Sequence, residues 1–293
     1  VVWDLDGLGS SGGGLLVDEA HGAHLALPSE PRGARVACAR AWVHGCHKTL
    51  GSLTQTGLLH LEAGIAPEPY AAWLEWLGST SPSYPLLASL DLARRWAAMN
   101  GRESWARAAE RLDGLRERLI LAGVRVLGPA DLPAGAALDP AKLTVAVPAG
   151  GRAAARLLQR DWGIQAEAAG LDWLTFLITP FHTDDELGRL ENALAAGARS
   201  APESAAAPWP LGIPESILSP KTASLSPRRR LPLDRAVGLV AAEPLCPYPP
   251  GIPLVWPGEV IGEEAVRYLR ATLDAGGTAN GFDPLGLVAV AEA

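Results

Sequence analysis

The chain contains few cysteines and lysines and no long apolar run. Its three cysteines, Cys38, Cys46 and Cys246, form no even disulfide framework, which makes a reducing cytoplasm the expected location. No apolar stretch reaches membrane-spanning length and no signal peptide is recognisable, so we expect no membrane partner. The formal net charge of -7 argues against a nucleic-acid partner, because nucleic-acid binders normally carry a basic patch.

Lysine occurs only as Lys48, Lys142 and Lys221. Arginine is effectively always protonated and cannot act as an amine nucleophile, so any lysine chemistry has three candidates. The chain is 48% hydrophobic and 19% charged, which is sufficient for two or three compact units with buried cores. It begins at Val1 without a methionine, and we interpret it as a fragment or a late start.

Two short apolar runs near the start predict neighbouring buried strands. They lie at residues 15–17 and 36–43, and their separation suits a strand–crossover–strand unit. Asp18 follows the first run and Lys48 follows the second. Because ligands of open α/β sheets bind outside the carboxyl ends of strands, we expect both side chains in one crevice.

The rest of the chain predicts alternating helices and strands. Residues 197–232, which are rich in Ala, Pro and Ser, predict a linker or an irregular surface segment. Apolar spacing predicts helices at residues 85–100, 102–122, 152–160, 184–196 and 263–275, and strands at residues 143–147 and 174–178.

Three motifs point to other kinds of site. Residues 7–12 match the dinucleotide fingerprint GxGxxG, but glycines and a strand follow where a helix is needed. Residues 18–21 spell DEAH, the magnesium-binding box of helicase-type NTPases, but the chain has no GxxxxGK[ST] phosphate loop. Four histidines and a cysteine near the start resemble zinc ligands, yet their spacing fits no familiar zinc site: His21, His24, His44, Cys46 and His47. We therefore expect no metal.

A lysine and an aspartate at neighbouring strand ends suit an enzyme that uses pyridoxal 5′-phosphate (PLP). Such an enzyme needs a lysine to bind the cofactor covalently and an acid to keep its pyridine nitrogen protonated. Alone, Lys48 is most simply a surface lysine and Asp18 a cap or turn residue. The pair in this strand context favours the functional interpretation. His47 is a candidate for contact with substrate or phosphate, or for proton transfer.

Several long motifs resemble the Orn/Lys/Arg decarboxylase family of fold type I PLP enzymes. Residues 15–25 (LLVDEAHGAHL) are similar to the family's aspartate strand and residues 47–56 (HKTLGSLTQT) to its cofactor-lysine segment. Residues 79–84 (STSPSY) are similar to the segment that follows. Matches to its smaller subdomain and C-terminal domain lie at residues 139–143, 163–167, 247–253 and 257–259. The resemblance spans nearly the whole chain, in order.

The resemblance implies a fold and a domain order. We expect an α/β chain that begins with the C-terminal half of a fold type I PLP-dependent transferase large domain, at residues 1–128. A smaller α/β subdomain is expected at residues 129–200, and a linker with a C-terminal α+β domain at residues 201–293. The N-terminal half of the large domain, with its phosphate-binding turn and ring-stacking residue, is expected upstream of Val1.

The resemblance also implies roles for six residues. Two are catalytic, one as the Schiff-base lysine and one as a histidine at the cofactor: Lys48 and His47. Asp18 would bind the pyridine nitrogen of PLP, and His21 would lie near its ring. Ser79 and Thr80 would reach its phosphate across a dimer interface. The family commonly has Ser-Thr-His-Lys where this chain has Gly45-Cys46-His47-Lys48. The loss of the serine hydroxyl at Gly45 puts one phosphate contact in doubt.

The function implied is the decarboxylation of a basic amino acid. Lysine, ornithine or arginine would give the corresponding amine and carbon dioxide, in a homodimer or a higher homo-oligomer. The alternative is a catalytically inactive remnant of such a decarboxylase, or one half of a split enzyme.

Overall fold

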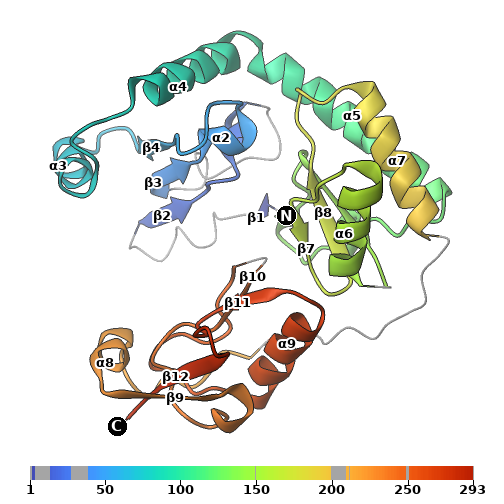
Figure 1. Cartoon of the computed structure of the whole chain (residues 1–293). Helices are drawn as coiled ribbons and strands as arrows, with labels where there is room; N and C mark the ends of the chain where they lie inside the picture. The colour runs from blue at the N-terminus through green and yellow to red at the C-terminus, as the bar shows by residue number, and fades with distance from the viewer. Residues whose placement is uncertain are drawn as a thin grey trace. The chain divides into compact units, whose positions relative to one another are not determined.

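A computed structural model gives the structure of the chain (Figure 1). Its contacts divide the chain into two compact units, which are described separately. Unit 1 comprises Val1–Arg118, Leu127–Leu143 and Ile178–Asp184; unit 2 comprises Leu119–Val126, Thr144–Leu177 and Asp185–Ala293. The domain boundaries expected at residues 128 and 200 stay predictions. The residues that the structure describes are 2–3, 14–27, 39–148, 150–198, 209–210, 212–248 and 251–292.

A three-stranded sheet forms the centre of unit 1. Its order is β2 (Leu15–Asp18), β3 (Ala39–His44) and β4 (Leu58–Leu61). The first two strands are parallel, which confirms the predicted strand pair. The burial expected for the first strand is wrong, because Leu16 of β2 is 74% exposed. β4 was not predicted; it returns antiparallel to β3, with Trp42 opposite His60. The glycine-rich motif at residues 7–12 lies outside the described residues.

A long helical run follows the sheet in unit 1. α4 (Tyr84–Trp96) continues through a π-helical stretch (Ala97–Gly101) into α5 (Arg102–Leu121), most of which belongs to unit 1. Helices were predicted at residues 85–100 and 102–122, with Gly101 as a break between them, but the run continues through Gly101. A Cβ at this glycine would lie 2.8 Å from Leu27 Cδ1, so its small size serves close packing. Among the described helices, none is apolar and long enough to cross a membrane.

Unit 1 also contains several shorter elements. α2 (Cys46–Thr49) follows β3 directly, and a 3₁₀ turn (Ala23–Ala26) follows β2. α3 (Glu68–Leu77), which was not predicted, buries none of its residues. β1 (Val2–Trp3) pairs antiparallel with β5 (Ala136–Ala137). A second 3₁₀ turn spans Pro129–Asp131.

The first part of unit 2 is a small α/β layer. Its sheet has the order β6 (Lys142–Ala146), β8 (Trp173–Leu177) and β7 (Ala168–Ala169), and β6 begins in unit 1. The helices are α6 (Gly151–Trp162) and α7 (Asp184–Ala198). Both strands and both helices predicted for this region are confirmed within one to two residues of their expected ends.

The C-terminal part of unit 2 is a compact α+β fold. β9 (Arg228–Pro232) pairs antiparallel with β12 (Leu287–Ala291), and β10 (Cys246–Tyr248) pairs antiparallel with β11 (Thr278–Asn280). The predicted C-terminal helix is confirmed as α9 (Glu263–Asp274). Its core consists of buried hydrophobic residues, among them Leu233, Leu245, Val255, Ile261, Leu269 and Val288.

The segment predicted to be irregular, residues 197–232, contains two regular elements, so this prediction was wrong in part. α8 (Pro220–Leu225) begins after Ser219, whose side chain caps the helix by accepting a hydrogen bond from the Thr222 backbone N–H. β9 exists because it pairs with β12 along five residues. Local composition did not predict β9, because its pairing partner lies at the far end of the chain.

Candidate active site

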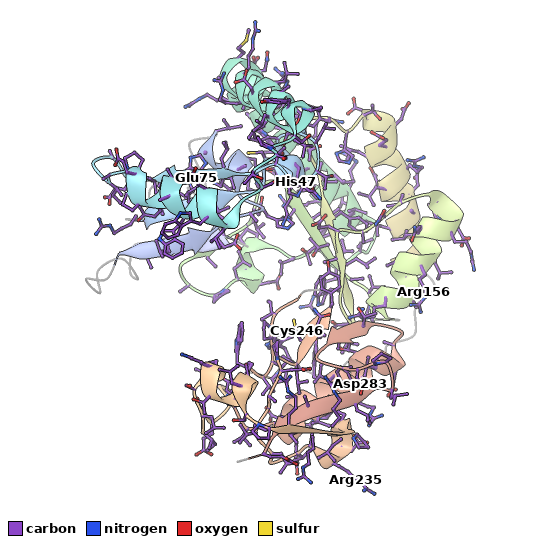
Figure 2. The ribbon with its side chains drawn as sticks, turned by 60° about the vertical axis from the view of Figure 1, so that its left-hand side comes forward. His47, Glu75, Arg156, Arg235, Cys246 and Asp283 are labelled. Atoms are coloured by element: carbon purple, nitrogen blue, oxygen red, sulfur yellow. The ribbon has the colours of Figure 1, made fainter. Side chains whose placement is uncertain are left out.

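Lys48 lies where the sequence predicted, just beyond the carboxyl end of a parallel strand. β3 ends at His44, Gly45 makes the turn, and Lys48 is in the single turn of α2 (Figure 2 labels its neighbour His47). The backbone N–H of Lys48 donates to the Gly45 carbonyl oxygen at 3.0 Å. The Lys48 residue is half-buried. Its amine is thus attached to a short rigid turn at the strand end.

Asp18 is the last residue of β2, the strand adjacent to β3. Two backbone hydrogen bonds extend the pairing past Asp18: Glu19 N–H donates to the Val43 carbonyl, and Gly45 N–H donates to the Ala20 carbonyl, both at 3.0 Å. The Asp18 Oδ1 accepts the Ala20 N–H at 3.0 Å, which orients the carboxylate. The structure therefore places Asp18 and Lys48 at the ends of neighbouring strands.

Gly45 lies at a close approach between the two strand ends. A Cβ at this position would lie 3.0 Å from the Ala20 carbonyl oxygen and 3.4 Å from Lys48 Cδ. A serine here would need a shift of a few tenths of an ångström. The glycine therefore allows the close approach of the two turns. It lacks the serine hydroxyl that is common at this position in the family that the sequence resembles.

His47 is half-buried beside Lys48, and its ring orientation is fixed. Its Nδ1 donates to the Thr56 carbonyl oxygen at 2.9 Å, since a carbonyl can only accept. The neighbouring Thr56 hydroxyl donates to the Leu53 carbonyl and contacts Ser52 Oγ at 2.6 Å. With Nδ1 occupied as a donor, Nε2 is the ring atom that can accept a proton or a hydrogen bond.

His21, which lies in the turn after β2, contacts a residue that was not assigned to the site. His21 Nδ1 lies 3.1 Å from Lys142 Nζ, the amine of a lysine at the start of β6. Sequence analysis gave Lys142 only as one of three lysines and as part of a motif. It lies 121 positions from His21, so no local pattern could have indicated the contact.

The remaining histidines near the strand ends also have partners that sequence analysis missed. His44 Nε2 lies 2.8 Å from Glu19 Oε2, and His60 packs edge-on against His44 with ring centroids 4.5 Å apart. Burial lowers the pKa of His60, and the neighbouring His44 lowers it further, whereas Glu19 acts in the opposite direction. Knowledge of the β3–β4 register, which pairs Trp42 with His60, would have been needed to find this cluster.

The possible zinc ligands are dispersed among separate contacts. His24 contacts Asp139, His44 contacts Glu19 and His47 contacts Thr56. Burial raises the pKa of the Cys46 thiol, which opposes the thiolate form that binds metals. Within the described ranges, no group of three or more His, Cys, Asp and Glu residues could hold a metal ion.

Ser79 and Thr80 lie on an exposed segment after α3. Ser79 Oγ accepts a hydrogen bond from the Ser81 backbone N–H at 3.1 Å, and both residues are exposed. No contact recorded for either residue joins it to Lys48 or Asp18 within the described part of the chain. Their expected role at a cofactor phosphate stays a prediction.

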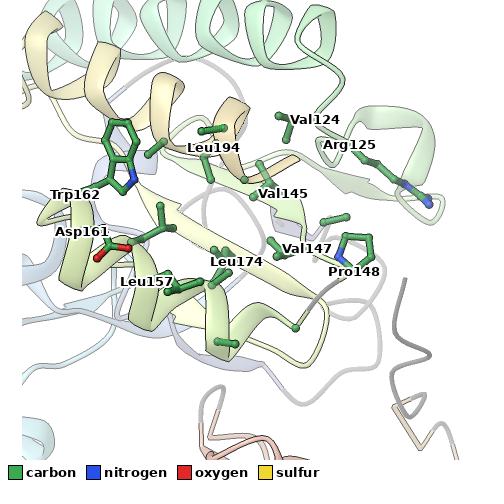
Figure 3. A pocket seen from close by; sticks show the side chains of 18 of the residues that line it. Val124, Arg125, Val145, Val147, Pro148, Leu157, Asp161, Trp162, Leu174 and Leu194 are labelled. Atoms are coloured by element: carbon green, nitrogen blue, oxygen red, sulfur yellow. The ribbon is translucent and has the colours of Figure 1, made fainter. Parts of the chain in front are cut away.

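A cavity in unit 2 has a different character. A cavity of about 450 Å³ lies between α6, the end of α7 and the sheet, and Figure 3 shows its lining. Apolar side chains such as Leu157, Leu174 and Leu194 dominate that lining. The one carboxylate in it, Asp161, is engaged by Arg160 at 2.5 Å. Every lining residue belongs to unit 2, whereas the six predicted site residues belong to unit 1.

Comparison with known families gives two matches along this chain. The family model described as "Orn/Lys/Arg decarboxylase, major domain" matches residues 5–134. The model described as "Orn/Lys/Arg decarboxylase, C-terminal domain" matches residues 207–286. The first contains all six predicted site residues.

Several curated relatives are named as decarboxylases of basic amino acids. The chain is 34% identical over 275 residues to an arginine decarboxylase of Bacillus subtilis, and the match covers 89% of this chain and 56% of that protein. It is 32% identical over 287 residues to an arginine decarboxylase of Bacillus anthracis, with the same coverage. An inducible lysine decarboxylase of Escherichia coli is 43% identical, over 54 residues, 17% of this chain and 8% of that protein. The chain spans about half the length of the first two relatives.

Solved structures show the fold. The constitutive lysine decarboxylase of E. coli matches 99% of this chain and 56% of its own, with a TM-score of 0.77 and 19% identity. A lysine decarboxylase of Francisella novicida has a TM-score of 0.79 at 16% identity, with the same coverage. An alanine–glyoxylate aminotransferase of Nostoc sp. has a TM-score of 0.50 at 19% identity, covering 66% of this chain and 56% of its own. The expected fold class, part of a fold type I PLP-dependent enzyme, is confirmed.

Proposed function

Because this chain belongs to the Orn/Lys/Arg decarboxylase family, we propose that its protein removes the α-carboxylate of a basic amino acid as carbon dioxide, with PLP as cofactor on Lys48. The observation that carries the proposal is the position of Lys48 and Asp18 at the carboxyl ends of the parallel strands β3 and β2. Ligands of open α/β sheets bind at such strand ends.

The groups at these strand ends fit PLP chemically. When bound, PLP supplies a conjugated ring that withdraws electrons from the substrate Cα. Lys48, a half-buried residue, offers an amine for covalent attachment, and the short turn of α2 limits the positions that this amine can take. Asp18 offers a carboxylate, the group that can hold a proton at a pyridine nitrogen. An amine and a carboxylate on adjacent strand ends are the pair that this cofactor requires.

Asp18 is preorganised for that role by its own backbone. The Ala20 N–H occupies Oδ1, which leaves Oδ2 to face a protonated nitrogen. A carboxylate that is already oriented needs little reorganisation to stabilise a positive charge. Asp18 would therefore hold the proton at the pyridine nitrogen throughout the reaction.

His47 would act beside the attached lysine as a hydrogen-bonding or proton-transfer group. Its Nδ1 is held by the Thr56 carbonyl, so its Nε2 lone pair is the reactive site. That atom can contact the substrate or the cofactor phosphate, or it can transfer a proton. His21, in the turn after β2, would lie near the cofactor ring. Its Nδ1 contacts the amine of Lys142.

A second copy of the chain would complete the site. Ser79 and Thr80 are exposed and follow α3, none of whose residues is buried. In a homodimer these hydroxyls would be available to the phosphate of the neighbouring copy, as the family resemblance implies. The substrate class is arginine, lysine or ornithine, and the longest matches, to proteins named arginine decarboxylase, make arginine the first to assay.

The test is to locate the cofactor and measure the reaction in the full-length protein. Borohydride reduction of the PLP-loaded protein followed by peptide mapping should place the pyridoxyl group on Lys48. Lys48→Ala should abolish this label and carbon dioxide release, while Lys221→Ala, on the exposed turn of α8, should change neither. A label on Lys142 or Lys221 would contradict the site.

The inactive alternative predicts a different result from the same protein. Wild-type protein that is labelled at Lys48 but releases no carbon dioxide from arginine, lysine or ornithine would favour the inactive remnant. Activity that appears only on adding a separate polypeptide would favour the split enzyme.

A further inference from the structure

The turn that carries Lys142 is anchored in the interior of unit 1. Asp139 Oδ1 accepts the Ala141 N–H at 2.8 Å and also the buried His24 Nε2–H at 2.8 Å. The Lys142 N–H donates to the Asp139 carbonyl at 3.1 Å. Arg116, from α5, donates to the carbonyl oxygen of Lys142 at 2.6 Å. The backbone that carries the Lys142 side chain is therefore fixed from several sides.

The same anchor fixes the backbone that carries His21. His24 is completely buried, stacks on Trp105 with ring centroids 4.7 Å apart, and lies three positions after His21. The turn between β2 and this 3₁₀ segment is closed by the Gly22 N–H, which donates to the Glu19 carbonyl at 2.8 Å. The His24–Asp139 pair thus joins two segments that are far apart in sequence, and the contact between His21 and Lys142 lies beside it.

The donor and the acceptor in the Lys142–His21 contact can be assigned. An ammonium group has three donors and no acceptor, so the His21 Nδ1 at 3.1 Å must be the acceptor. A neutral imidazole with an acceptor at Nδ1 carries its proton on Nε2.

We propose that Lys142 is a positioning residue, which fixes His21 as the tautomer with its proton on Nε2. His21 then presents one N–H donor, while its basic nitrogen is occupied. It can donate a hydrogen bond to an oxygen of cofactor or substrate, and it is not a general base through Nδ1. His47 has the opposite assignment, because its Nδ1 is the donor and its Nε2 the acceptor. The role at the cofactor rests on the proposed function, whereas the tautomer does not.

The direct test measures the ring nitrogens of His21. Two-bond ¹H–¹⁵N correlation spectra of the ¹⁵N-histidine-labelled full chain, without PLP and at a pH where the ring is neutral, should show Nε2 protonated and Nδ1 as a hydrogen-bonded acceptor. His21→Gln assigns the signals by removing them. A spectrum with the proton on Nδ1 of His21 would overturn the proposal at once.

Three variants at Lys142 separate positioning from a merely structural role. Lys142→Met removes the donor but keeps an apolar stem, and should move the Nδ1 shift to that of a nitrogen without a hydrogen bond. Lys142→Glu replaces a donor with an acceptor and should transfer the proton to Nδ1. Lys142→Arg keeps a cationic donor and should preserve the wild-type pattern. Lys221→Glu, an exposed lysine on α8, is the control and should change nothing.

The outcomes are distinguishable even if one variant fails to fold. If Lys142→Glu does not fold, Lys142→Met and Lys142→Arg still decide, because they predict opposite Nδ1 shifts. An unchanged His21 spectrum in Lys142→Met overturns the proposal. In the PLP-loaded protein, Lys142→Met should lower kcat and Lys142→Arg restore it. A protein with the expected His21 tautomer but no carbon dioxide release would refute the proposed function and leave the positioning of His21 intact.

Discussion

The C-terminal part of unit 2 and the strand-end region of unit 1 are stabilised in different ways. Among the described residues, the C-terminal core contains thirteen buried hydrophobic residues, most of them large. The cluster next to Lys48 contains five in the same described part of the chain, and three of these are alanines: Ala23, Ala93 and Ala97. Because apolar burial scales with the area removed from water, the C-terminal core contributes far more hydrophobic stabilisation than this cluster does.

Around the strand ends, polar pairs hold the structure where apolar burial is small. Asp139 binds His24, Glu19 binds His44, and Lys142 binds His21. Substitutions should therefore have different effects in the two regions. In the C-terminal core they should change stability and leave the chemistry intact, whereas among the polar pairs they should change the chemistry or the pH dependence of stability.

A large stability effect is expected in the C-terminal core. Leu269 of α9 is completely buried, so Leu269→Ala should lower the free energy of unfolding by about 2–5 kcal/mol through lost burial and a residual cavity. Urea titration followed by circular dichroism measures this change. The labelling of Lys48 by PLP and borohydride should stay as in the wild type under native conditions.

A matched leucine supplies the control for this prediction. Leu285 is 82% exposed, so Leu285→Ala should change the free energy of unfolding by no more than about 0.5 kcal/mol. If Leu269→Ala abolished the labelling of Lys48 while the chain stayed folded, the separation between the two regions would be wrong.

A smaller, pH-dependent effect is expected at Asp139. Burial alone would raise the pKa of this carboxyl, but the hydrogen bond and charge of His24, the Ala141 N–H and the Lys142 ammonium together bring it below its ordinary value. A carboxyl whose pKa is lower in the folded state stabilises the fold above its unfolded pKa. That contribution is lost as the pH falls through the folded pKa.

Asp139→Asn tests this contribution because the amide oxygen can still accept both hydrogen bonds. At pH 7 the variant should lose about 1–3 kcal/mol of unfolding free energy, and the difference from wild type should shrink below about pH 4. Urea titrations at several pH values measure it. Asp91→Asn is the control, since the ion pair of Asp91 with Arg94 is exposed and should be worth less than about 1 kcal/mol. A difference that stays constant down to pH 3 would show that the Asp139 charge contributes nothing.

Sequence patterns predicted the parts of the fold that local periodicity determines. The parallel pair β2–β3, the helices α4 to α7 and the positions of Asp18 and Lys48 at strand ends all followed from apolar spacing. β9 was missed because its sequence is rich in arginine and its partner β12 is more than fifty positions away. The family resemblance, and no spacing rule, supplied the expected roles of Ser79 and Thr80.

The contacts within the site could not be predicted, for a related reason. His24 and Asp139 lie 115 positions apart, and His21 and Lys142 lie 121 apart. Each residue alone has an ordinary local explanation, and only the folded chain brings the partners together. The histidines that resembled zinc ligands are explained by these separate pairs.

The smallest effect is expected on α3, where large apolar side chains contribute little to the fold. Trp76 is 72% exposed, and its main aromatic contact is an edge-to-face pair with Trp73 on the same helix, with ring centroids 5.1 Å apart. Trp76→Ala should therefore change the free energy of unfolding by about 0.5 kcal/mol at most, because little area is returned to water. Trp105→Ala is the matched substitution in the same unit: Trp105 is 2% exposed and stacks on His24, so its loss should cost about 3–5 kcal/mol. Urea titration of both variants at low protein concentration gives the comparison. A loss above about 2 kcal/mol for Trp76→Ala would mean that α3 is covered in solution, and sedimentation velocity of the wild type would then show an assembly larger than one chain.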